Sequence, residues 1–218
     1  MNKSTIHPDE TLLTAYSAGS LPLSQALCIS AHVEHCPTCQ QEIKHLNDLG
    51  SELMQQLKPS PGSTDLKAQL LARLDSLDET HEAPTRIDKT ISRCLHQFIK
   101  NGYQNLAWKR VSPDIHSVEL CRDSNGAKVE LLRIKPGGAA TTHTHLGDEY
   151  TVILEGSFSD ESGLYQKGDF LLRDASHQHR PVATQDGECI CLAVTEGPIQ
   201  FTGLFSRLLN PLIRRSYA

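Results

Sequence analysis

The sequence contains no long apolar run, no internal repeat and no low-complexity tract. None of its stretches approaches the roughly 18 apolar residues that span a bilayer, so no membrane contact is expected. The first thirteen residues have no apolar core behind their lysine, so we see no secretory signal. A cytoplasmic protein is therefore expected.

A disulfide framework is also not expected. The chain has seven cysteines, an odd number, and they are scattered unevenly. In a reducing cytoplasm such cysteines favour metal ligation or free thiols. Eleven histidines accompany them, so the spacing of the two residue types is the informative feature.

Positive charge is scarce in the first part of the chain. Residues 1–85 hold five Lys/Arg against eleven Asp/Glu, a net charge of −6, whereas the remainder carries +1. An acidic surface repels phosphates, which argues against direct DNA binding and against a DNA-binding repressor. It favours a partner with a basic surface.

Length and composition predict two soluble globular domains. The chain has 218 residues, of which 38% are hydrophobic and 22% are charged. The expected bounds are 1–78 for a helical domain, 79–104 for a linker with a possible short helix, and 105–218 for an all-β domain.

Caps and apolar spacing predict four helices in the first domain. Proline and acidic residues at Pro8–Glu10 suit the start of the first helix, which Gly19 ends. The second and third are expected over residues 23–34 and 38–57, and a Pro/Gly/Ser breaker precedes the fourth. The fourth helix carries an apolar stripe of Leu66, Leu70, Leu71, Leu74 and Leu77. Such a stripe either completes its own domain's core or docks on a partner.

The second domain has the pattern of an all-β protein. A short amphipathic helix is expected over residues 89–100, and the apolar period changes after it. Many short β-rich runs separated by turn residues indicate a sandwich or barrel. These runs are 107–111, 116–120, 129–134, 150–154, 169–172 and 190–194. A last apolar segment, residues 205–213, has no assigned role.

The first candidate metal site is a His-x-x-x-Cys-x-x-Cys motif. His32 and Cys36 are one helical turn apart and share a face, while Cys36 and Cys39 can converge on one ion. Tetrahedral zinc needs four such ligands, and His7 is the best candidate for the fourth. A redox-active thiol pair is less favoured, because no thioredoxin-like βαβ unit surrounds the motif.

Two other side chains are rival ligands, His35 and Cys28, although His35 is adjacent to Cys36 and points to another face. The arrangement resembles the zinc-binding anti-sigma domain. The matching positions are His7, His32, Cys36 and Cys39. The resemblance implies a domain that wraps an extracytoplasmic-function sigma factor and blocks its access to RNA polymerase, with the fourth helix as a contact.

The second candidate metal site has the spacing of the first cupin motif. Gly137, His143, His145, Glu149 and Gly156 reproduce that spacing in full. His143 and His145 are two apart, so in an extended chain they point to the same face, and Glu149 can return to the same ion after a turn. Zinc, iron, manganese, nickel and copper all suit such ligands.

The second cupin motif supplies one more histidine. Counted from Gly168, the usual ligand falls at His179, and His177 is the alternative because an i, i+2 pair shares a strand face. The sequence departs from the motif where the family usually has proline and glycine. Asp174 and Ser176 stand there, which leaves the turn geometry open.

Catalysis has to be weighed because many cupins are enzymes. Four protein ligands leave one or two positions on a five- or six-coordinate metal, so a dioxygenase or isomerase with an accessory zinc domain is the alternative. Nothing else in the sequence identifies a substrate. Cys189 and Cys191, two apart on a predicted strand, favour core packing over a redox role.

The whole chain resembles the ChrR family of anti-sigma factors, and residues 158–168 are similar to that family's barrel segment. The resemblance implies a small helical zinc domain followed by a cupin barrel (double-stranded β-helix or jelly roll). It implies a non-enzymatic regulator that sequesters an extracytoplasmic-function sigma factor and responds to singlet-oxygen or peroxide stress. Zinc in the first domain, and zinc or another divalent transition metal in the second, are the expected cofactors.

Overall fold

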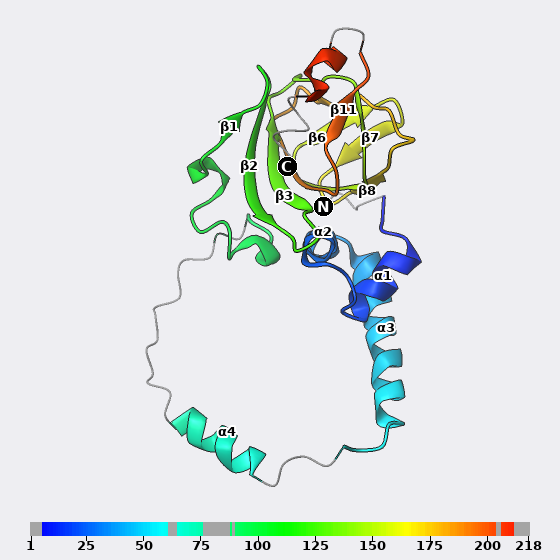
Figure 1. The fold of residues 1–218 in the computed structure, drawn as a ribbon, viewed down its shortest axis with the longest axis vertical. Coiled ribbons are helices and arrows are strands. Elements are labelled where there is room, and N and C mark those ends of the chain that lie inside the picture. The colour runs from blue at the N-terminus through cyan, green and yellow to red at the C-terminus, as the bar shows by residue number, and fades with distance from the viewer. Residues whose placement is uncertain (1–5, 61–64, 76–87, 89, 204–205, 212–218) are drawn as a thin grey trace.

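The computed structural model describes residues 6–60, 65–75, 88, 90–203 and 206–211. Figure 1 shows a helical N-terminal part at one end of a β-barrel. One helix projects away from the barrel, and another stands apart from the rest of the molecule. The helices are α1 (Glu10–Ser17), α2 (Leu23–Val33), α3 (Pro37–Gln55) and α4 (Leu66–Asp75).

Local capping explains where these helices begin and end. The Asp9 carboxylate caps α1 by accepting a hydrogen bond from the Leu12 amide at 2.8 Å. Gly19 follows α1 with a φ of +66°, a conformation that favours glycine and ends a helix. Pro37 occupies the first turn of α3. The four predicted helices are present, and of the predicted leucine stripe only Leu77 lies outside the described residues.

The short α-helix predicted over residues 89–100 is wrong. The described part of that segment forms one 3-10 turn, η1 (Arg93–Leu95), and a second, η2 (Tyr103–Asn105), follows. Glu34 follows the last residue of α2. Its carboxylate accepts hydrogen bonds from the backbone amides of Arg93 and Cys94 at 3.0 and 3.3 Å. This tertiary contact fixes a tight turn where helical spacing alone predicted a longer helix.

The barrel consists of antiparallel strands in two layers. The larger sheet has the order β1 (Lys109–Arg110), β2 (Ile115–Arg122), β3 (Lys128–Ile134), β10 (Cys189–Thr195), β5 (Glu149–Glu155) and β8 (Phe170–Arg173). The second layer contains β7 (Gly163–Gln166), β6 (Ser157–Asp160), β9 (Val182–Ala183), β11 (Ile199–Phe201) and β4 (His143–His145). Bridges from Ala139 to Val182 and from His143 to His179 join its two sheets.

The predicted fold class is confirmed, because a helical part precedes a cupin-like barrel. All six β-rich runs predicted from sequence contribute strands to the larger sheet. The strands of the second layer were not predicted apart from the extended His143–His145 segment. They have only two to four residues each and lack the apolar alternation of longer strands.

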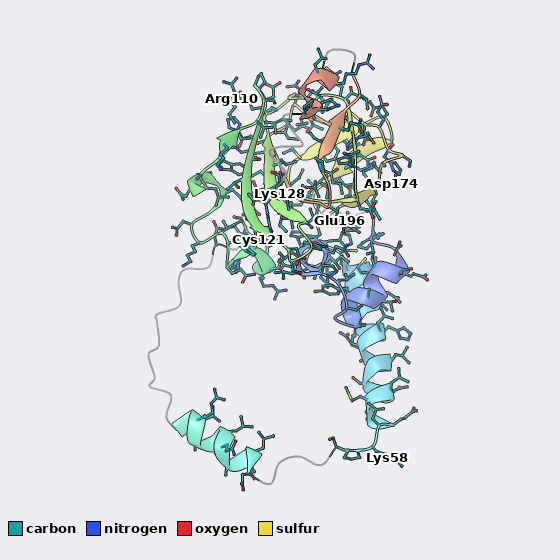
Figure 2. All side chains as sticks on the ribbon, in the orientation of Figure 1. Lys58, Arg110, Cys121, Lys128, Asp174 and Glu196 are labelled. Atoms are coloured by element: carbon teal, nitrogen blue, oxygen red, sulfur yellow. The ribbon has the colours of Figure 1, made fainter. Side chains whose placement is uncertain are left out.

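Helix α2 lies against the barrel. Leu27, Cys28 and Ile29 of α2 belong to the same buried cluster as Val152 and Leu192 of the larger sheet. Polar contacts accompany this packing: the Gln25 side chain donates to Glu196 at 2.7 Å, and Figure 2 places Glu196 at this junction. The two parts therefore share one continuous hydrophobic core.

The two remaining helices expose apolar side chains. Leu49, Leu53 and Met54 lie on the far half of α3, and the last two are more than half exposed. The leucines of α4 at positions 66, 70, 71 and 74 are about half exposed or more. None of the helices in the described part of the chain combines the length and the apolar character needed to cross a membrane.

Candidate metal centres

The N-terminal cluster forms where α2 ends and α3 begins. His32 lies in the last turn of α2, and Cys36 is the residue that caps α3. Cys39 lies in the first turn of α3, and its amide donates to the Cys36 sulfur at 3.4 Å. The chain before α1 brings His7 against both sulfurs. A local motif and one distant residue thus complete a group of four.

The four potential ligand atoms lie within 4.8 Å of one another. His7 Nδ1 is 3.2 Å from Cys36 Sγ and 3.6 Å from Cys39 Sγ, and His32 Nε2 is 3.3 Å from Cys39 Sγ. In a tetrahedral zinc site, bonds of about 2.0 Å to nitrogen and 2.3 Å to sulfur put such atoms about 3.5 Å apart. The donor set and its spacing therefore fit a tetrahedral ion.

The second nitrogen of His32 is already occupied. His32 Nδ1 is 2.6 Å from the carbonyl oxygen of Gly168, so this nitrogen carries the proton and Nε2 is left to accept or to bind a metal. Burial lowers the pKa of His32 to about 4, which keeps the ring neutral. Burial also raises the pKa of the Cys39 thiol to about 12, and a bound cation would reverse that preference.

The structure does not bring the two rival residues into this group. His35 follows α2 but is not among the four residues whose ligand atoms meet. Cys28 is fully buried in α2, and its thiol donates to the Tyr150 carbonyl oxygen at 3.5 Å. It belongs to the contact between α2 and the barrel.

The barrel cluster forms where β4 lies against the segment before β9. His143 and His145 both point inward from β4, and both are buried, as the i, i+2 spacing predicts. His179 is held opposite His143 by two backbone hydrogen bonds of 3.0 and 3.1 Å. Glu149 is the first residue of β5.

Three imidazole nitrogens converge inside the barrel. His179 Nε2 is 3.2 Å from Nε2 of both His143 and His145, and the three histidines form a group within 4.8 Å. The Glu149 carboxylate stands beside this group, 3.2 Å from His145 Nε2. Burial raises the pKa of Glu149 to about 7 and lowers the pKa of His145 and of His179 to about 4. Three neutral imidazoles and a nearby carboxyl group suit a divalent cation.

The structure places the two candidate histidines of the second motif differently. His179 belongs to the buried group, whereas His177 lies on an exposed turn, where its Nδ1 is 2.8 Å from an Asp174 carboxylate oxygen. Ser176 also donates to Asp174, at 2.6 Å. The residues that depart from the family motif thus build their own hydrogen-bonded turn, with His177 as part of it.

Sequence reasoning missed the residues that support the barrel cluster. His143 Nδ1 lies 2.7 Å from the Thr141 carbonyl oxygen, and His179 Nδ1 lies 3.4 Å from a carboxylate oxygen of Asp160. The side chain of Asp160 is fully buried and also accepts a hydrogen bond from Arg173 at 3.3 Å. No local pattern marked Asp160, because it is on β6 and meets His179 only in the fold.

A small cavity of about 70 Å³ adjoins the barrel cluster. His143, Glu149 and His179 line it together with apolar side chains and Cys191. Cys191 and Cys189 are buried, and their sulfurs are 3.5 Å apart, so both are free thiols. They belong to the second apolar cluster of the barrel, in line with core packing.

The fold and these two groups define a class of protein: a cupin-like barrel carrying a helical His/Cys centre. Residues 98–200 match the family model described as ChrR Cupin-like domain. The chain is 30% identical over 209 residues to the anti-sigma-E factor ChrR of Cereibacter sphaeroides, covering 95% of this chain and 97% of that protein. It is also similar to ChrR in the crystal structure of the Rhodobacter sphaeroides SigE–ChrR complex. That match has 29% identity and a TM-score of 0.78, and it covers 88% of this chain and all of the other.

The protein therefore belongs to the ChrR family of anti-sigma factors. This confirms the resemblance predicted from the two motifs. Two groups of side chains in the described residues could hold a metal ion, one in each part of the molecule.

Proposed function

We propose that this protein is a zinc-dependent anti-sigma factor that regulates transcription by sequestering an extracytoplasmic-function sigma factor in the cytoplasm. The observation that carries the proposal is the similarity, over nearly the whole chain, to a ChrR solved in complex with SigE. The proposed division is an inhibitory helical domain over residues 1–78, a connecting segment over 79–104 and a sensing barrel over 105–218.

The proposed zinc ligands are His7, His32, Cys36 and Cys39. Two thiolates and two imidazoles are a common set for structural zinc, and a site with four protein ligands is closed to substrates. Zinc would join the segment before α1 to the α2–α3 corner, and so fix the angle at which α3 leaves the barrel. The zinc is therefore assigned a structural role.

The proposed sigma-factor surface consists of the far half of α3 and the leucine face of α4. Leu53, Met54 and Leu74 are each more than half exposed, which is unusual for large apolar side chains in such number. A groove of about 680 Å³ runs between α1 and α3 beside this surface. The net charge of −6 over residues 1–85 favours a basic partner and disfavours direct DNA contact.

The proposed barrel metal is zinc or another divalent transition metal, held by His143, His145, Glu149 and His179. The adjoining cavity of about 70 Å³ is well below the roughly 300 Å³ or more of typical small-molecule sites. It has room for a few waters or for an oxidant of similar size. This size supports a sensor of singlet oxygen or peroxide, and it weighs against the alternative of a cupin dioxygenase or isomerase with an organic substrate.

The test is co-expression of the full chain with each extracytoplasmic-function sigma factor of the same organism. We expect one of them to co-purify as a stable complex and to be inactive in transcription until it is released. The Cys36→Ala, Cys39→Ala double variant should lose the complex, while the His143→Ala variant should lose the change in complex stability that oxidative stress causes in the native chain. If the wild-type chain retains none of these sigma factors, the proposal is wrong.

A further inference from the structure

Strand β8 has only four residues, yet each of its ends adjoins one of the two candidate metal centres. We propose that β8, with Asp160 and Arg173 at one end and Gly168 and Asp169 at the other, links the two centres. Through it, the state of the barrel cluster controls the His/Cys cluster. This inference rests on the proposed function, because it names the route by which the barrel regulates the inhibitory part.

At the first end of β8, the residues at and just before the start of the strand contact His32. The carbonyl oxygen of Gly168 accepts the 2.6 Å hydrogen bond from His32 Nδ1. Gly168 has a φ of +94°, which other residues rarely adopt, and this conformation sets the direction of its carbonyl group. The ring of Phe170, the first residue of β8, lies edge-on to the His32 ring at 6.0 Å. A shift of β8 therefore moves the group that orients His32.

The same end also holds the segment that carries His7. The Ile6 amide donates to the Asp169 carboxylate at 3.2 Å, and the Ile6 carbonyl oxygen accepts from the Phe170 amide at 3.0 Å. His7 is the next residue. A cavity of about 280 Å³, lined by His7, Phe170 and Arg173 among others, lies alongside. This space lets the Ile6–His7 segment move once its bonds to β8 are broken.

At its other end, β8 reaches the barrel cluster twice. Arg173 donates to the Asp160 carboxylate at 3.3 Å and to the Tyr165 hydroxyl at 2.6 Å, and the same Asp160 oxygen faces His179. Arg173 is also paired with Glu149 in the β5–β8 register. The end of β8 therefore reaches His179 through Asp160, and it is paired directly with Glu149.

The length and pairing of β8 make it a stiff connection. Four residues at about 3.3 Å each span only about 13 Å. The strand is hydrogen-bonded to β5 along this length, so a displacement at one end is passed to the other. One junction contact away from β8 is different: the Ser24 hydroxyl donates to the Asp123 carboxylate at 2.8 Å, and neither residue bonds to a potential ligand of either cluster.

The experiment measures ion release from the His/Cys cluster in the full chain. The protein is loaded with Co²⁺, whose thiolate charge-transfer band reports only the ion bound by cysteine, and the loss of this band is followed after addition of a chelator. We expect the His143→Ala variant, which disables the barrel cluster, to release this ion about fivefold faster or more than the native chain. The expected cause is the lost orientation of His179, which loosens Asp160 and β8.

A double-mutant cycle then locates the route. Asp169→Ala removes the acceptor for the amides of Ile6 and Gln166 without replacing a potential metal ligand, so in its background His143→Ala should change the release rate less than in the native chain. Arg173→Met cuts the opposite end of β8 and should have the same effect, which covers the case that Asp169→Ala does not fold. Asp123→Ala is the matched control, since it breaks a junction contact away from β8 and should keep the fivefold effect.

Three results would overturn the proposal. These are equal release rates in the native and His143→Ala chains, a full effect of His143→Ala in both the Asp169→Ala and Arg173→Met backgrounds, and loss of the effect in Asp123→Ala. The measurement needs no partner protein. A chain that showed this link but bound no sigma factor would refute the proposed function and leave the inference standing.

Discussion

Replacing Asp160 by asparagine tests the barrel centre most directly, because Asp160 orients a candidate ligand without being one. Its carboxylate is fully buried and accepts hydrogen bonds from Ser162, Tyr165 and Arg173 at 2.8, 2.9 and 3.3 Å. Burial opposes ionisation, but these bonds prevail and lower the pKa of Asp160. The group facing His179 is therefore a carboxylate, which raises the basicity of that imidazole.

The Asp160→Asn change should have two separable effects. A neutral amide no longer supports His179, and loss of such an outer partner costs about 10- to 100-fold in metal affinity, or roughly 1.4 to 2.7 kcal/mol. The change also leaves Arg173, whose side chain is 14% exposed, without its opposite charge. Removing one partner of a buried pair costs about 3 kcal/mol or more of folding stability.

Competition with a chelator of known affinity measures the first effect, and thermal unfolding of the metal-free protein measures the second. Asp174→Asn is the matched control: Asp174 lies on the exposed turn with His177, and Figure 2 shows it at the barrel surface. It should change the metal affinity less than about twofold, since surface changes typically cost under 0.5 kcal/mol. An Asp160→Asn protein with native metal affinity would refute the assigned role of Asp160.

Three further predictions concern other parts of the molecule. The Cys36→Ala, Cys39→Ala double variant should lose its zinc and the order of the helical part, since structural zinc contributes on the order of 10 kcal/mol; full zinc occupancy by elemental analysis would contradict this. His179→Ala should lower the metal content of the barrel and His177→Ala should not, and the reverse result would move the ligand by two residues. Bonds from Ser24 lower the pKa of Asp123, so its contribution to stability is complete above its ordinary pKa of about 3.8 and is lost as pH falls below the folded value. Asp123→Asn should remove this acid-side loss in unfolding curves.

The sequence predicted that most of the side chains in the two clusters would meet, because these residues are close in sequence. A helical turn brings His32 to Cys36, and a strand alternation brings His143 to His145. The larger sheet was predictable for a similar reason, since its strands carry apolar runs. These patterns are local, and each follows from the period of one secondary structure.

The supporting residues were not predictable, because their contacts join distant parts of the chain. Asp160 meets His179 across two strands, and the bond from His32 to Gly168 spans 136 positions. The packing of α2 on the barrel could not be predicted from the apolar spacing either, because Leu27 and Ile29 indicate only that α2 has a buried face. Which surface covers that face is decided by the tertiary fold.

The separation of α4 from α3 has a consequence for the strength of the proposed inhibition. Ten residues of sequence lie between Gln55 and Leu66, so one chain carries both exposed apolar faces a short sequence distance apart. A partner held by one face meets the other at a local concentration in the millimolar range, and such two-point binding can exceed either single affinity by about 100- to 10,000-fold. The same two-point binding makes release easy to trigger. A signal that reorients α3 alone would leave the partner bound only by α4, with the lower affinity of a single face.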